Sequence, residues 1–308
     1  MSIENKNIDF ESSALSGERR PEGEALFVIK IGGNVIDNPE ALKFFLKDFA
    51  KISATKEHSS PLRGPGASRA ILVHGGGKIA TKIGDQLGIE SKYINGRRIT
   101  DDDTIDLVTM VYGGLVNKKI VAQLQAHNCN AIGLTGADAN IIPATKRPLV
   151  SLPAGEGQGG AIDFGWVGDI DNNQLQTEKL KLLIDAGLTP VFAPLTHDSQ
   201  GHILNTNADT IASALAVALS KYYQVRLIYC FEKKGVLENV NDDNSVITKI
   251  NKEKYAALVA ENKLFEGILP KIDNAFAAID AGVNEVLIGH ANDLLKNTTE
   301  ETDGTLIY

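Results

Sequence analysis

Residues 69–87 read RAILVHGGGKIATKIGDQL, and this stretch decides the fold class. Its first part is a short apolar run of the kind found in strands that are buried on both faces of a sheet. Three glycines follow, and a helical pattern begins directly after them. A strand that runs through a tight turn into a helix is the repeating unit of α/β sheets.

The same unit recurs along the chain. Strand-like apolar runs at 26–32, 130–136, 189–195, 225–231, 285–290 and 304–308 alternate with helical patterns at 38–52, 101–127, 177–187, 207–220, 251–264 and 269–282. The first of these helices begins with the capping sequence Asn38-Pro39-Glu40, and the second is expected to be interrupted at Gly113-Gly114. We predict an α/β protein, a three-layer αβα sandwich with a mainly parallel central sheet.

Length, charge and composition exclude several classes of protein. The chain has 308 residues, a formal net charge of −8 and 43% hydrophobic residues, which favours a globular protein over a disordered one. An acidic chain is not expected to bind nucleic acid, and no apolar run approaches the roughly 20 residues that cross a bilayer. The N-terminus is polar and acidic, unlike a signal peptide, so we expect a cytoplasmic protein. Cys129 and Cys230 have no metal-ligand spacing and are expected to be buried.

Two glycine clusters follow strands, at Gly32-Gly33 and at Gly75-Gly76-Gly77. In a parallel sheet both clusters lie at the carboxyl edge, where ligands bind. Glycines there allow backbone N–H groups and a helix N-terminus to face an anion. Each cluster alone fits an ordinary tight turn, because neither matches a known phosphate-loop pattern. Together they favour a phosphate or carboxylate site.

Several polar residues fit such a site without requiring it. Lys30 lies inside an apolar strand, and Lys271 lies near a helix start where a cation opposes the helix dipole. The segment 205–209, NTNAD, holds three polar residues, of which a helix cap explains one but not all three. If the segment is extended, Asn205 and Asp209 lie on one side. Arg98 can hold a carboxylate, but it can equally pair with the acids at 101–103. Both lysines can also be ordinary solvated surface residues.

These motifs resemble a known family when they are taken together. IKIGG at Ile29, HGGGK at His74, NGRRIT at Asn95, WVGDI at Trp166, NTNAD at Asn205 and PK at Pro270 occur in the order seen in the acetylglutamate kinases of the amino acid kinase family. The resemblance covers the chain from Leu26 to its end. It implies a carbamate kinase-like fold and transfer of the ATP γ-phosphoryl group to the side-chain carboxylate of N-acetyl-L-glutamate in arginine biosynthesis, with Mg²⁺ carried by ATP rather than by protein ligands.

The resemblance also implies a role for each motif residue. Catalysis would fall to Lys30, Lys271 and Asp209; the amino-acid substrate would meet Gly33, Gly76, Gly77, Arg98 and Asn205; and the nucleotide would meet Gly32, Glu232, Lys234, Gly235, Leu237 and Glu266. A flexible extension at 1–23 would precede an N-acylglutamate-binding and dimerisation lobe at 24–204 and a nucleotide-binding lobe at 205–308, both on one sheet. His74 is expected to be structural, because a carboxylate nucleophile needs no general base.

The chain departs from the family pattern in three places. Phe231 and Glu232 stand where the family has a Ser/Thr-Asp-Val pattern, and Glu266-Gly267-Ile268 replaces Gly-Gly-Met before Lys271. The segment 1–23 lacks the amphipathic helix of arginine-inhibited hexamers, so we expect a homodimer without arginine feedback. Two alternatives remain open: the same chemistry on N-succinyl-L-glutamate, and a non-catalytic metabolite-binding regulator on the same fold.

Overall fold

The computed structural model describes residues 24–54, 69–94, 97–151, 161–239, 241–264 and 266–308. The expected extension at 1–23 lies outside these residues. Within them, eight strands form one central sheet in the order β14-β16-β15-β13-β1-β2-β10-β5. The strands are β1 (Ala25–Ile31), β2 (Arg69–His74), β5 (Ala131–Leu134), β10 (Thr189–Phe192), β13 (Gln224–Phe231), β14 (Lys249–Ile250), β15 (Glu285–His290) and β16 (Thr305–Ile307).

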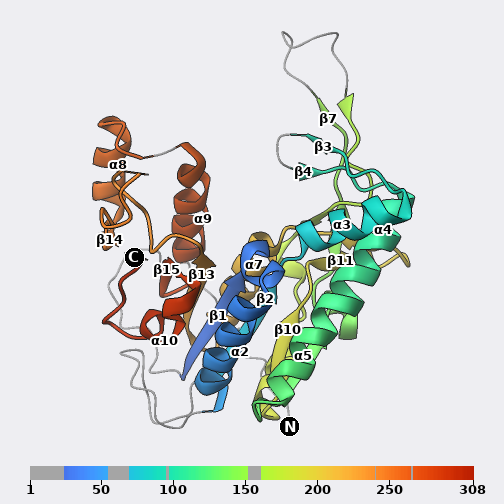
Figure 1. Cartoon of the computed structure of the whole chain (residues 1–308), viewed down its shortest axis with the longest axis horizontal. Coiled ribbons are helices and arrows are strands. Elements are labelled where there is room, and N and C mark those ends of the chain that lie inside the picture. Colours follow the sequence, from blue (N-terminus) through green and yellow to red (C-terminus); the bar gives the residue numbers. More distant parts are fainter. Residues whose placement is uncertain (1–23, 55–68, 95–96, 152–160, 240, 265) are drawn as a thin grey trace, which may run out of the picture.

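All neighbouring strands of this sheet are parallel except β15 and β16. The main helices are α1 (Gly33–Asp37), α2 (Pro39–Ala54), α3 (Gly77–Leu87), α4 (Asp102–Val108), α5 (Asn117–Gln125), α6 (Thr177–Asp185), α7 (Ala208–Leu219), α8 (Lys252–Ala260), α9 (Leu269–Asp280) and α10 (Leu294–Asn297). They flank the sheet on both faces (Figure 1). The predicted α/β class and mainly parallel sheet are confirmed.

Short strand pairs and 3₁₀ turns lie outside the central sheet. Antiparallel two-stranded pairs join β3 (Tyr93–Ile94) to β4 (Arg97–Arg98), β6 (Ala144–Lys146) to β9 (Gly168–Ile170), β7 (Val150–Ser151) to β8 (Ala161–Ile162), and β11 (Leu195–His197) to β12 (Ile203–Asn205). Among the described residues, short 3₁₀ turns occur at η2 (Asp138–Asn140), η3 (Asn172–Gln174), η4 (Glu266–Ile268) and η5 (Ala291–Asp293).

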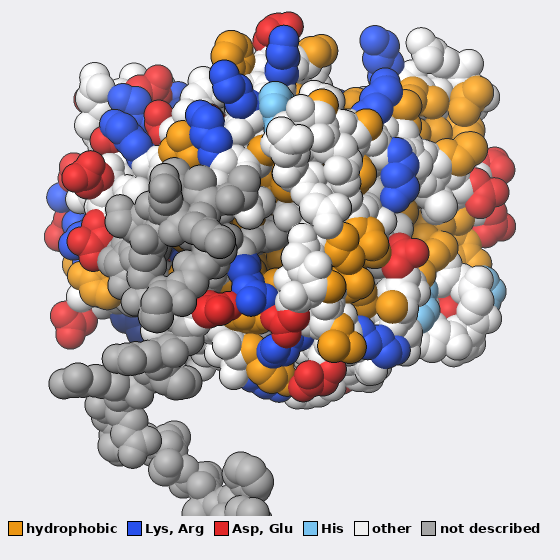
Figure 2. Space-filling model, turned by 90° about the horizontal axis from the view of Figure 1, so that it is seen from below, with side chains coloured by type: hydrophobic (Ala, Val, Ile, Leu, Met, Phe, Trp, Pro, Cys, Tyr) orange, Lys and Arg blue, Asp and Glu red, His pale blue; other side chains and the backbone are white. Residues whose placement is uncertain are grey.

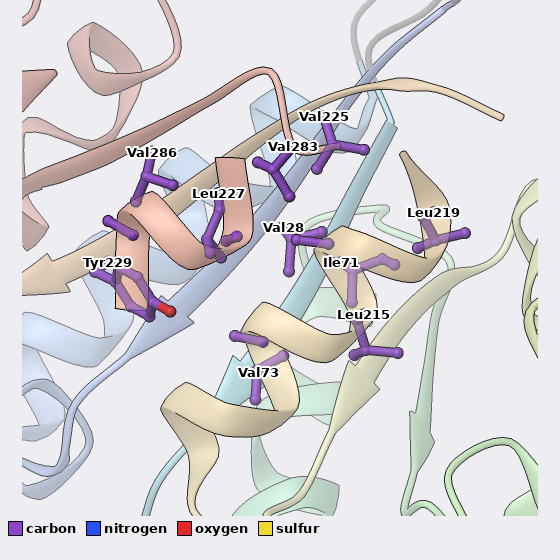
Figure 3. Packing of buried hydrophobic residues seen from close by; sticks show 14 of the residues in the cluster. Val28, Ile71, Val73, Leu215, Leu219, Val225, Leu227, Tyr229, Val283 and Val286 are labelled. Carbon is purple, nitrogen blue, oxygen red and sulfur yellow. The ribbon is translucent and has the colours of Figure 1, made fainter. Parts of the chain in front are cut away.

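Alternating side chains of β1 divide the core into two halves. Leu26 and Val28 pack with α7 and α9 on one face, whereas Phe27, Ile29 and Ile31 pack with α2 and α5 on the other. Figure 3 shows the first half, where strand residues meet helix residues such as Leu215. Because side chains of a strand alternate between its faces, the residue after Ile29 must point to the α7 side.

Two local expectations were wrong. The pattern at 101–127 is not interrupted at its glycines: α4 continues through a π-helical segment, η1 (Thr109–Val116), into α5. The backbone winds more widely there instead of breaking. The second error concerns α1, a five-residue helix inserted between β1 and the helix that Asn38 caps. No side chain caps α1, so the sequence carried no signal for it.

The surface shows no dominant charge on the face seen in Figure 2. Basic and acidic side chains are interspersed there among apolar ones. In the described part of the chain, every helix is too short or too polar to cross a bilayer.

Candidate active site

The two predicted glycine turns lie side by side at the carboxyl ends of β1 and β2. The backbone N–H of Gly75 donates to the carbonyl of Ile31 at 3.3 Å, and a Cβ on Gly75 would stand 3.7 Å from the nitrogen of Gly33. Gly33 begins α1 and Gly77 begins α3. Unpaired N–H groups at two helix starts therefore face the same edge of the sheet, which is the arrangement that binds an anion.

Gly76 is the position in these turns that glycine alone can fill. Its φ angle is +154°, and an added Cβ would lie 3.0 Å from Cδ1 of Tyr112. The ring of Tyr112 thus packs directly on the turn. The backbone shape and this close approach together explain why no side chain is present.

Lys30 and Asp209 form an ion pair beside the turns. Lys30 is the β1 residue that points toward α7, and its Nζ lies 2.7 Å from Oδ1 of Asp209. Asp209 belongs to the first turn of α7, which Asn207 caps by accepting from the N–H groups of Asp209 and Thr210. The backbone is still extended at Asn207 and becomes helical at Ala208, so the segment is not extended through Asp209 and the alternation of Asn205 with Asp209 does not hold. Lys30 is only 8% exposed, so its charge depends on this partner.

Lys271 joins this pair from α9. Its Nζ stands 3.6 Å from the ring centroid of Phe231, and Lys30 Nζ stands 5.4 Å from the same centroid. Burial lowers the pKa of the Lys271 ammonium, nearby Lys30 lowers it further, and Asp209 opposes both effects. The structure thus brings together all three residues predicted to be catalytic, with two ammonium groups facing one aromatic ring.

A pocket of about 430 Å³ opens beside Lys271 and extends under the C-terminal part of the sheet. Of the six residues expected to meet a nucleotide, Glu232, Gly235 and Leu237 line it, whereas Lys234 and Gly32 do not. The side chain of Glu266 lies outside the description, although its neighbours Gly267 and Ile268 contribute to the wall.

Arg98 is buried and has no carboxylate partner among the described residues. Its guanidinium donates to Ser91 Oγ at 2.5 Å, to Thr81 Oγ1 at 2.8 Å and to the Gly77 carbonyl at 3.1 Å, and it stacks on Tyr93 at 4.9 Å. All three acceptors are neutral. A buried cation held only by neutral groups favours an external anion, here next to the second glycine turn.

Two of the three acids that could have paired with Arg98 are engaged elsewhere. Asp101 caps α4 by accepting from the N–H of Thr104, and Asp102 accepts from the indole of Trp166 at 2.6 Å. Asn205 ends β12, and its amide donates to Thr100 Oγ1 at 3.0 Å. These bonds fix the orientation of the polar residues that border the Arg98 side of the site.

His74 is neutral and structural, as expected. Its Nδ1 lies 2.7 Å from the Gly75 carbonyl and its Nε2 lies 3.2 Å from Nδ2 of Asn117. Since the amide donates to Nε2, the ring proton must reside on Nδ1 and be donated to Gly75. Burial lowers the pKa of His74 to about 4. The ring therefore braces the glycine turn and is not placed as a base.

Sequence reasoning missed several residues of the site. Asn34 and Val35 line the pocket from α1, and Lys78 donates a hydrogen bond to Oδ1 of Asn34. Phe231 was noted only as a departure from the family pattern. A lysine directly after the glycine turn was the available signal for Lys78. No group of three or more His, Cys, Asp or Glu that could hold a metal ion occurs within the described ranges.

Comparisons with known proteins agree with this geometry. The profile of the amino acid kinase family matches residues 25–290. The acetylglutamate kinase of Cytophaga hutchinsonii is 51% identical over 283 residues, covering 92% of this chain and 98% of that protein. The acetylglutamate kinase of Methanopyrus kandleri is 35% identical over 269 residues, covering 87% and 96%. Giardia carbamate kinase shares the fold with a TM-score of 0.60 at 13% identity, covering 92% of this chain and 98% of that one. The resemblance stated from the motifs is confirmed.

Proposed function

The chain belongs to the amino acid kinase family, and we propose that it transfers the γ-phosphoryl group of ATP to the side-chain carboxylate of N-acetyl-L-glutamate, a step of arginine biosynthesis. The observation that carries the proposal is the cluster of Lys30, Asp209 and Lys271 beside two glycine turns. Two anionic substrates must approach each other in this reaction, and the cluster supplies positive charge at the place where they meet.

The chemistry requires positioning and charge stabilisation rather than a base. A carboxylate is ionised at neutral pH, so its oxygen attacks the γ-phosphorus directly while the bond to the β,γ-bridging oxygen breaks and ADP leaves with that electron pair. Lys30 and Lys271 stabilise the charge on the transferring group, and Asp209 holds Lys30 in place. The backbone N–H groups of Gly33, Gly76 and Gly77 add hydrogen-bond donors that point toward the transferring phosphoryl group.

We assign the two substrates to opposite sides of this cluster. Arg98 and Asn205 hold the α-carboxylate of the amino acid, which gives the buried guanidinium its missing anion. ATP occupies the pocket lined by Glu232, Gly235 and Leu237. Contacts of the nucleotide with Lys234, Gly32 and Glu266 rest on the family resemblance alone. The lobe at 24–204 thus supplies most of the amino-acid contacts and the lobe at 205–308 most of the nucleotide contacts, although Asn205 and Asn34 each lie across this division. Mg²⁺ enters with ATP and supplies charge neutralisation on the phosphate oxygens.

One assay tests the proposal and its alternatives. Purified protein is incubated with Mg-ATP and, separately, N-acetyl-, N-succinyl- and free L-glutamate, and acyl phosphate is trapped with hydroxylamine. We expect hydroxamate from N-acetyl-L-glutamate. A higher kcat/KM with N-succinyl-L-glutamate would show that this compound is the substrate, and the proposed mechanism would stand. No product from any of the three would refute the kinase and favour a metabolite-binding regulator.

We further propose that the protein is a cytoplasmic homodimer without arginine feedback. This rests on the sequence before residue 24, which lacks the amphipathic pattern of hexamer-forming relatives. Sedimentation velocity at micromolar concentration should give a dimer. A hexamer, or inhibition by L-arginine, would contradict it.

A further inference from the structure

A second cavity, of about 560 Å³, lies on the outer side of α1, between the start of α2, the start of α3 and the junction of η1 with α5. We call it the α2–α3–α5 pocket. Apolar side chains that include Ile36, Leu42 and Leu115 line part of it, and charged side chains line the rest. It shares no lining residue with the candidate nucleotide pocket.

Asp37 is the most unusual of the charged residues. Both of its carboxylate oxygens are buried and accept no hydrogen bond from the described residues, and the nearest ammonium, that of Lys78, is 3.9 Å away. Burial raises the pKa of this carboxyl group, and Lys78 opposes the shift only in part. The Asp37 side chain as a whole is 21% exposed, but carboxylate oxygens that are buried without a donor are costly, so their position at the pocket points to a ligand that donates a hydrogen bond to them.

Three lysines, Lys78, Lys82 and Lys119, line the same pocket. Lys82 and Lys119 are exposed at the rim, and neither has an ion-pair or hydrogen-bond partner in the part of the chain that the structure describes. With Lys78 they give the pocket an excess of positive over negative charge. Unpaired ammonium groups above an apolar floor fit an organic anion better than a neutral molecule.

The pocket is placed to influence nucleotide binding through α1. Asn34 and Val35 of this helix line the nucleotide pocket, whereas Ile36 and Asp37 line the α2–α3–α5 pocket. Lys78 spans the two, because it lines the second pocket and hydrogen-bonds to Asn34 in the first. The N-terminus of α1, at Gly33, belongs to the anion-binding turn. A ligand that draws Lys78 or Asp37 toward itself must therefore shift α1 and, with it, the position of the backbone N–H groups in this turn.

We infer that the α2–α3–α5 pocket binds a small organic anion that has an apolar body and one N–H or O–H donor, and that this binding is coupled to nucleotide binding across α1. The coupling rests on the proposed function of the neighbouring pocket, whereas the binding does not. Because coupling between two sites is reciprocal, nucleotide must change the affinity for the anion by the same factor.

The probe for a first test is 8-anilino-1-naphthalenesulfonate, which has a sulfonate, an aryl N–H and two apolar ring systems. Its fluorescence is titrated with the full chain in saturating AMP-PNP, so that the nucleotide pocket is occupied. We expect saturable binding that weakens at least about 10-fold in Lys82→Glu/Lys119→Glu, as loss of two charge-assisted contacts implies. Lys43→Glu/Lys47→Glu makes the same charge change on the exposed side of α2 and should bind like wild type.

A second variant tests the site independently, in case the double lysine variant does not fold. Leu115→Trp fills the pocket without changing charge and should also abolish saturable binding. Equal binding by wild type and both pocket variants, or complete displacement of the probe by AMP-PNP at a 1:1 ratio, would overturn the site.

Coupling is measured separately as the Kd for AMP-PNP with and without saturating probe. We expect a change of at least about fivefold, the lower end of usual coupling between sites, and its loss in Leu115→Trp. An unchanged Kd would overturn the coupling. A protein that binds the probe as expected but forms no acyl phosphate would refute the proposed function and leave the site standing.

Discussion

Lys30 and Asp209 come from elements far apart in the chain, and their charged groups meet at 2.7 Å at the carboxyl edge of the sheet. The alternation of β1 directs Lys30 toward α7, and the cap at Asn207 places Asp209 in the first turn of that helix. A lysine in a buried strand would otherwise be expensive. The ion pair offsets this cost and holds the Lys30 ammonium in a fixed position beside the glycine turns.

Removing either ammonium group should slow the chemical step. We expect Lys30→Ala and Lys271→Ala to lower kcat by at least about 10²-fold, the effect of losing one transition-state charge partner. Lys43→Ala, on the exposed side of α2, serves as the matched control and should keep wild-type turnover. Circular dichroism must show that all three variants are folded. Near wild-type kcat in either cluster variant would rule out the proposed mechanism.

The activity should fall at alkaline pH because of Lys271. Burial places the pKa of its ammonium below the ordinary value of 10.5, so the free enzyme loses this charge earlier than an exposed lysine would as pH rises. Bound phosphates favour the charged form and must raise the pKa again. The alkaline limb of kcat/KM for ATP should therefore lie at lower pH than the limb of kcat. Lys271→Arg should move the alkaline limb of kcat/KM above the measurable pH range. A limb that stays in place would show that another group titrates there.

The sequence predicts the α/β sandwich because its signals are local. Each apolar run and each cap acts within a few residues, and their order alone requires a parallel sheet. The edge position of Gly33 and Gly76 follows from that order. Asn34 could not be predicted in the same way, because its place depends on α1, which has no capping side chain.

Residues that depend on tertiary contact escaped prediction as well. Ser91 and Thr81 support Arg98 through contacts of β4 with α3 and with the segment before β3. Phe231 broke the family pattern in the sequence, and only the structure shows its ring facing both ammonium groups. The family resemblance supplied roles for the motif residues, but it could not supply these supporting contacts.

Arg98 should control the affinity for the amino acid and not for ATP. We expect Arg98→Gln to raise KM for N-acetyl-L-glutamate at least about 10-fold, since a hydrogen bond to a charged group is worth about 1.5–3 kcal/mol. KM for ATP should stay near the wild-type value. Arg98→Lys keeps the charge without the planar fork and should be intermediate. An equal rise in both KM values would indicate a structural role instead.

Gly76 should tolerate no side chain. Gly76→Ala must adopt a φ near +154° and press a methyl group against Tyr112, so we expect a loss of about 1–3 kcal/mol in the free energy of unfolding. Gly114→Ala is the matched control, because a Cβ there meets nothing within 4 Å. Urea unfolding of both variants gives the comparison. Equal stability of the two would show that the turn relaxes without cost.

His74 should make the stability of the protein depend on pH. Its pKa is about 4 in the folded chain and near 6.5 when unfolded, so the unfolded state binds the extra proton between these values. Its contribution is complete above about pH 6.5 and falls as the pH drops toward 4, by up to about 3 kcal/mol in all. Urea unfolding at pH 7 and pH 5 should therefore show a larger loss for wild type than for His74→Gln. The variant His127→Gln removes a histidine that follows α5 and should lose as much as wild type. An equal loss in His74→Gln and wild type would mean that this ring is already charged in the folded protein.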